Sequence, residues 1–186
     1  MKRFLISLTA LVLAAFAASA QDDQAVLSKI AAAHKGGLSV EKRFVEIRTK
    51  GKKTETLKGM LTFAKPDTFN MVYDNGELFS IEGSSMTIRR GKKENRFDLG
   101  KNKMMAGLSH TLLYSFRGTL KELAEEQNSE IRAVKEKEGY RVTLTAVKKS
   151  ARGYGKVEVI YGLKDCGVVS ILLEEFGGNS TFYSWE

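Results

Sequence analysis

The sequence is poor in cysteine, histidine and proline, and each shortage excludes a kind of structure or chemistry. The 186 residues include one cysteine, Cys166, so no disulfide can form within the chain. The two histidines, His34 and His110, have no Cys, Asp or Glu at the spacing of a metal site. Pro66 is the only proline, and no linker or repeat divides the chain. The composition therefore predicts one domain whose core is stabilised without disulfide bonds or metal ions.

Motifs of catalysis are also scarce. Ser109 and His110 are adjacent, but no G-x-S-x-G sequence is present, and sequence neighbours on a helix do not face one another. The glycine-rich segment 153–156 matches neither the P-loop nor the dinucleotide fingerprint. We therefore expect no enzyme activity, no catalytic residue, no cofactor and no bound metal.

Acidic residues are outnumbered, and the formal net charge is +8. Lysine and arginine are concentrated in segments 50–53, 89–93 and 148–156. A basic surface can attract anionic lipid headgroups or acidic proteins, and the alternative is that these segments are solvated hairpin tips. Nucleic acid is not an expected partner, because aromatic residues are not interleaved with the basic segments.

Long apolar runs are absent except at the beginning of the chain. Lys2 and Arg3 precede an apolar run over 4–18, and Ala18-Ser19-Ala20 has the small-x-small pattern of a cleavage site. The run is shorter than the roughly 20 residues that a membrane-spanning helix needs. Residues 1–20 are therefore predicted to be a cleavable signal peptide, and the mature chain, 21–186, is expected to be periplasmic.

Beyond the signal peptide, the pattern predicts one helix followed by many short strands. The first helix is expected from Asp22 or Asp23 to about His34, and two more are expected over 103–116 and 119–127. Strands are predicted at 40–49, 55–63, 68–73, 77–82, 85–90, 94–98, 130–136, 140–147, 156–161, 168–176 and 180–185.

This order of elements predicts an α+β fold with a curved antiparallel sheet of about 11 strands, because a single sheet of that size tends to curl or split. We expect an unclosed half-barrel with about three helices covering its concave face. Five of the six methionines fall on the first-half strands and the helix over 103–116. Since methionine adapts to irregular apolar partners, this face is predicted either to be an ordinary core or to enclose a lipid-sized cavity.

Residues 59–73 read G-M-L-T-F-A-K-P-D-T-F-N-M-V-Y. This segment resembles the strand pair G-x-L-x-x-x-R-P-x-x-F-x-W of the LolA family of periplasmic lipoprotein carriers, with matches at Gly59, Leu61, Pro66 and Phe69. The signal peptide, the mid-chain helices and the closing strands follow the same order over nearly the whole mature chain. Two positions depart from the pattern: Lys65 replaces the arginine before the proline, and Met71 replaces the tryptophan.

The resemblance implies a carrier that binds the acyl anchor of lipoproteins in a hydrophobic cavity and moves them from the inner toward the outer membrane. The implied partners are acylated lipoproteins, an inner-membrane lipoprotein-releasing transporter and, where present, an outer-membrane acceptor. We expect the carrier to be a monomer. The alternatives are a periplasmic binder of another lipid or glycolipid, and a non-catalytic envelope interaction or sensor domain whose inner face is filled by side chains.

Alternation along the predicted strands indicates which residues would form such a cavity. The predicted wall comprises alternate residues of the early strands: Phe44, Leu61, Phe63, Phe69, Met71, Tyr73, Phe79, Ile81, Met86 and Ile88. The predicted lid is the helix over 103–116, with Met104, Met105, Leu108 and Leu112 facing the wall. Lys65 is the candidate lid contact, since the arginine of the carriers is associated with holding the lid closed.

Overall fold

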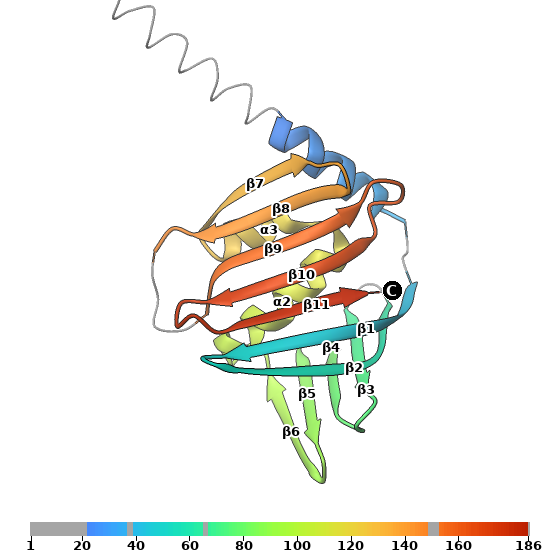
Figure 1. Ribbon diagram of the computed structural model, residues 1–186, viewed down its shortest axis with the longest axis vertical. Helices are drawn as coiled ribbons and strands as arrows, with labels where there is room; N and C mark the ends of the chain where they lie inside the picture. The colour runs from blue at the N-terminus through green and yellow to red at the C-terminus, as the bar shows by residue number, and fades with distance from the viewer. Residues whose placement is uncertain (1–21, 37–38, 65–66, 149–152, 186) are drawn as a thin grey trace, which may run out of the picture.

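One antiparallel sheet of 11 strands forms the body of the protein (Figure 1). The computed structural model describes residues 22–36, 39–64, 67–148 and 153–185. The predicted signal peptide, Lys65, Pro66 and part of the basic segment 148–156 lie outside these residues. The strands are β1 (Ser39–Lys50), β2 (Lys53–Ala64), β3 (Thr68–Tyr73), β4 (Leu78–Glu82), β5 (Ser85–Arg90), β6 (Lys93–Asp98), β7 (Ser129–Lys135), β8 (Gly139–Ala146), β9 (Tyr154–Gly162), β10 (Val168–Glu175) and β11 (Ser180–Trp185).

The strand order is β6-β5-β4-β3-β2-β1-β11-β10-β9-β8-β7, so β6 and β7 are the two edges and the sheet is not closed into a barrel. Pairing of β1 with β11 joins the first and last strands, with Phe44 opposite Trp185. The predicted half-barrel is confirmed. The boundaries of the predicted strands agree with the observed ones to within two residues, because strong alternation and turn residues marked them.

Within the described residues, three helices accompany the sheet: an N-terminal helix over 22–33, α2 (Lys103–Arg117) and α3 (Leu120–Glu126). The Asn102 side chain caps α2 by accepting a hydrogen bond from the Met105 amide at 3.1 Å. Gly118 ends the helix in the left-handed conformation, with φ of 69°. Over the described residues, none of the helices is long and apolar enough to cross a membrane.

Helices α2 and α3 lie against one face of the sheet (Figure 1), and the strands turn their apolar residues toward them. Phe116 of α2 packs against Phe63 and Phe69, with ring centroids 5.4 Å apart in both pairs. The Ser109 hydroxyl donates a hydrogen bond to the Met86 sulfur at 3.3 Å. The face beneath the helices is therefore the concave, buried face of the half-barrel.

Polar contacts at both ends of the N-terminal helix tie it to the rest of the fold. A carboxylate oxygen of Asp23 accepts a hydrogen bond from the Ala133 amide of edge strand β7 at 3.0 Å. The buried His34 ring lies 2.9 Å from the Phe116 carbonyl oxygen through Nδ1 and 2.7 Å from the Cys166 carbonyl oxygen through Nε2. His34 therefore has a structural role, because it connects the N-terminal helix to the end of α2.

Gly59 is required by the packing of β2. A Cβ at this position would lie 2.2 Å from the Val72 carbonyl oxygen and 2.7 Å from the Phe44 ring. The Phe44 ring lies over the glycine and meets Tyr73 edge-on at a centroid distance of 5.1 Å. The glycine of the strand motif thus provides the space for one of the wall aromatics.

We predict that Gly59→Ala lowers the free energy of unfolding by about 2 kcal/mol, because the added methyl overpacks a site bounded by backbone. Urea denaturation monitored by tryptophan fluorescence would measure this change. Gly107→Ala is the matched control: a Cβ at Gly107 of α2 meets nothing within 4 Å, so alanine should leave the stability unchanged or raise it by up to about 1 kcal/mol. Equal losses in the two variants would contradict the packing explanation.

Candidate functional site

The structure brings the ten predicted wall residues onto one face of β1 to β5. Nine of them are buried, and Ile88 is partly buried against the same core. Adjacent wall residues are register partners, as Leu61 is with Met71 and Met71 with Phe79. The alternation in the sequence therefore predicted the inward face of each strand.

The space between this wall and α2 is filled by side chains. Leu112 is 1% exposed and Phe116 is 3% exposed. The Phe116 ring also meets Trp185 of β11 edge-on at a centroid distance of 5.2 Å. Of the two sequence-based alternatives for this face, a packed core describes the present conformation, and a bound acyl chain requires α2 to move.

The predicted lid residues are not all equivalent. Leu112 is buried, and Met105 and Leu108 are partly buried against the core. Met104 does not face the wall: it is 55% exposed. It belongs to the first turn of α2, and the buried residues of this helix begin only at Ser109. Lys65 lies outside the described residues.

An ion pair that the sequence analysis missed links α2 to the rim of the sheet. Arg117, in the last turn of α2, pairs with Asp67, which precedes β3. Asp67 directly follows the Lys65-Pro66 segment in which the lid contact was expected. The prediction placed the basic residue, Lys65, beside β3. In the structure the acidic residue, Asp67, lies beside β3 and the basic residue, Arg117, lies on the helix.

A cavity of about 350 Å³ lies beside this ion pair. Leu113, Tyr114 and His110 of α2 form one side of it, and the turn at Gly83 and Ser84 forms another. Leu99 and Leu113 are buried apolar residues of its lining. The cavity therefore lies between α2 and the turns around Asp67 and Gly83, beside the packed concave face.

The concave face also contains a buried charged group, Glu46 of β1, which is 1% exposed. Arg48 donates two hydrogen bonds to its carboxylate, at 2.6 and 2.9 Å. The Tyr73 hydroxyl donates a third at 2.6 Å. Since the carboxylate is paired and hydrogen-bonded, its burial is tolerated next to Phe44 in an otherwise apolar wall.

These contacts change how the neighbouring groups ionise. Burial raises the pKa of Tyr73, and the negative charge of Glu46 raises it further. Burial opposes the charged form of Arg48, but the hydrogen bonds and the charge of Glu46 outweigh this and raise the pKa of Arg48. The arginine, the carboxylate and the neutral tyrosine therefore form one coupled group.

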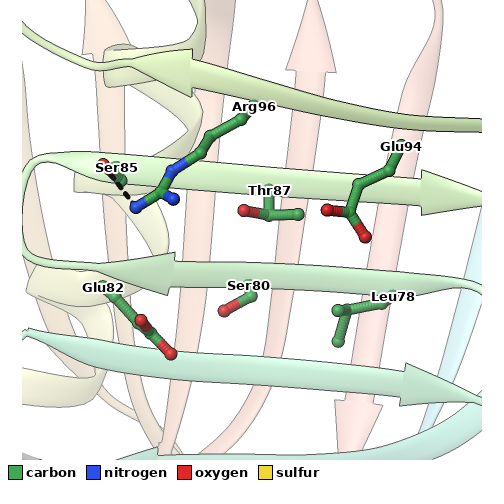
Figure 2. Close-up of a pocket in the computed structure, with 7 residues that line it drawn as sticks. All are labelled: Leu78, Ser80, Glu82, Ser85, Thr87, Glu94 and Arg96. Atoms are coloured by element: carbon green, nitrogen blue, oxygen red, sulfur yellow. Dashed lines mark hydrogen bonds between the residues drawn. The ribbon is translucent and has the colours of Figure 1, made fainter.

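A second hollow, of about 220 Å³, lies on the opposite face of β4 to β6. Figure 2 shows that polar side chains line it, with Arg96 donating to the Ser85 hydroxyl at 3.5 Å. Ser80 and Thr87 are register partners on this face, while Ile81 and Met86 face the core. The hollow therefore lies outside the apolar wall and does not belong to the candidate site.

Among the described residues, no group of three or more His, Cys, Asp or Glu side chains is arranged to hold a metal ion. His110 lies 2.6 Å from a Glu126 oxygen, and Cys166 is buried in the turn between β9 and β10. Burial raises the pKa of the Cys166 thiol, whereas nearby Lys29 lowers it.

The search of known proteins gives matches only among solved structures: no family model and no curated protein matches the chain. A LolA superfamily protein from Nitrosomonas europaea is 8% identical, with a TM-score of 0.41, over 89% of this chain and 91% of that one. A proposed outer membrane lipoprotein-sorting protein domain from Vibrio parahaemolyticus is 12% identical, with a TM-score of 0.47, over 90% and 91%. The lipoprotein LppX from Mycobacterium tuberculosis is 13% identical, with a TM-score of 0.37, over 88% and 94%.

At identities of 8 to 13% these matches carry no chemistry of the site, which rests on the residues of this chain.

We predict that Asp67→Asn increases binding of a fluorescent apolar probe. Loss of a partly exposed ion pair is worth about 0.5 to 1 kcal/mol, which corresponds to a roughly two- to fivefold larger population with α2 displaced. Probe titration by fluorescence would measure it. Asp74→Asn removes the exposed Arg43–Asp74 pair, which involves neither α2 nor the wall, and should leave probe binding unchanged. Equal effects of the two variants would contradict a role for the Asp67–Arg117 pair in holding α2.

We predict that Glu46→Gln lowers the free energy of unfolding by about 2 kcal/mol, because it leaves the Arg48 charge without its buried partner. Chemical denaturation would measure the loss. Glu55→Gln is the control, since Glu55 is exposed and lies 3.8 Å from the same arginine; its removal should change stability by less than about 0.5 kcal/mol. A larger loss for Glu55→Gln than for Glu46→Gln would contradict this assignment.

Proposed function

We propose that the protein is a periplasmic carrier that binds the acyl anchor of lipoproteins on its concave face and moves them from the inner toward the outer membrane. The observation that supports this most directly is the continuous apolar wall of β1 to β5, covered by a helix that one partly exposed ion pair attaches to the rim. The strand motif at 59–73 supports the same class of cargo.

A carrier has to offset a large free-energy cost of exposing acyl chains to water. Each methylene of an acyl chain costs about 0.8 kcal/mol to expose to water, so an anchor with several chains does not cross an aqueous space unaided. The wall offers aromatic rings together with Met71 and Met86, which adapt to chains of variable shape. An acyl chain would replace the contacts that α2 now makes with this wall.

The affinity for an acyl chain is limited, because the chain must displace the α2 side chains that already pack against the wall. Loading separates Phe116 from Phe63, Phe69 and Trp185, which offsets part of the favourable burial of the chain. A carrier has to release its cargo, so a closed unloaded state of this kind suits transfer between two membranes. The cavity beside Asp67 and Arg117 is where we propose that opening begins.

The second candidate is a non-catalytic envelope interaction or sensor domain. It is favoured by the filled concave face, in which the described side chains of wall and helix pack against each other. In this function the core remains closed, and the outer face or the strand edges contact a partner. A displacement assay separates the two candidates: acyl chains compete with an apolar probe for a carrier, whereas a permanently closed core binds neither.

The decisive experiment places a photo-crosslinking residue at Ile88, which belongs to the wall and is only partly buried. In cells, we expect crosslinks to lipoproteins that disappear when lipoprotein acylation is blocked. The control position is Val72, which is 49% exposed, and it should give no acylation-dependent crosslink. Crosslinks to free lipid alone at Ile88 would favour a binder of another lipid, and equal crosslinking at the two positions would contradict the proposed cargo site.

A further inference from the structure

Two strongly basic hairpin tips project from the sheet, the β1–β2 turn at the left of Figure 1 and the β5–β6 turn at its bottom. Strand β1 ends at Lys50 opposite Lys53, and β5 ends at Arg90 opposite Lys93. Every neighbouring pair from β1 to β6 is antiparallel, so the turns of β1–β2, β3–β4 and β5–β6 follow the same ends of these strands. Figure 1 shows the β5–β6 turn extending away from the body of the molecule.

The cations of these tips are exposed and available. Six of them define what we call the basic tips: Lys50, Lys52, Lys53, Arg89, Lys92 and Lys93. All six side chains belong to exposed residues. Within the described residues, no carboxylate lies within ion-pairing distance of any of the six, and Arg90 is the member of these tips that has such a partner, Glu77.

The acidic groups between the two tips do not neutralise them. The intervening β3–β4 turn carries Asp74 and Glu77, which pair with Arg43 and Arg90. In addition, β3 pairs only with the second half of β2, from Gly59 opposite Tyr73 onward. The β1–β2 tip therefore extends beyond the acidic turn along the direction of the strand.

We propose that the basic tips dock the protein on the anionic surface of a lipid bilayer. A positive surface of exposed lysine and arginine gains from a negative surface potential without any specific contact. Segments 50–53 and 89–93 carry no apolar side chain, so they lack the aromatic or aliphatic anchor on which protein–protein affinity usually depends. Two separate tips that project from the sheet in different directions also suit an extended surface better than a compact partner.

Such docking is electrostatic, so it is reversible and weakens as salt screens the charges. It does not rest on the proposed cargo site, because the tips contribute none of the wall residues. Binding to vesicles without binding to acyl chains would support the docking surface and contradict the carrier function. Binding to acyl chains without binding to vesicles would support the carrier function and contradict the docking surface.

The test is co-sedimentation of the protein, prepared without residues 1–20, with vesicles of phosphatidylglycerol and phosphatidylcholine at increasing salt. We expect binding at low salt that is lost as salt rises, and no binding to vesicles of pure phosphatidylcholine. Each basic residue near the surface contributes roughly fivefold to the binding constant, so Lys50→Gln with Lys52→Gln and Lys53→Gln should lower it by roughly a hundredfold.

The matched control removes the same number of charges elsewhere: Lys121→Gln, Lys135→Gln and Lys137→Gln change exposed lysines of α3, β7 and the β7–β8 turn. This variant should keep most of the vesicle binding. Equal losses in both triple variants would overturn the proposal in favour of net charge alone. Failure of the unmodified protein to bind anionic vesicles, or tip-dependent binding to polyglutamate and not to vesicles, would overturn it as well, the latter in favour of an acidic protein partner.

Discussion

The pairing of β1 with β11 joins the two halves of the chain into one sheet, and the remaining structure depends on this junction. It places Phe44 opposite Trp185 and Glu46 opposite Tyr183 at the centre of the concave face. Trp185 then supplies one side of the aromatic cluster that receives Phe116 of α2. Without the junction, β1 and β11 would be exposed edges, and the helix would lack half of the surface that it covers.

The concave face combines two opposite requirements. Its apolar wall excludes water and favours association with α2, whereas Glu46 and Arg48 require polar partners within the same surface. The network with Tyr73 meets this requirement, because every partner donates to the one carboxylate. A buried ion pair adds little net stability compared with apolar residues, but it restricts how β1 and the neighbouring strands can pack.

The last turn of α2 is attached to the rest of the fold by polar contacts, whereas its first turn is more exposed. Its last turn contacts the rim through Arg117, and the Phe116 carbonyl oxygen meets His34 of the N-terminal segment. Its first turn leaves Met104 exposed. A helix attached in this way covers the sheet through side-chain packing and a few polar contacts, so its displacement would not break the backbone hydrogen bonds that pair the strands.

Local pattern in the sequence was sufficient to predict the strands, the helices and the inward face of the wall, because alternation and helical spacing are properties of neighbouring residues. The tertiary structure alone decided which distant residues meet: Asp67 with Arg117, Glu46 with Tyr73, and Phe116 with Trp185. Those contacts depend on sheet order and register, which many chain segments determine together. The same reason explains why the sequence predicted an apolar face, while only the packed structure decided that α2 fills it.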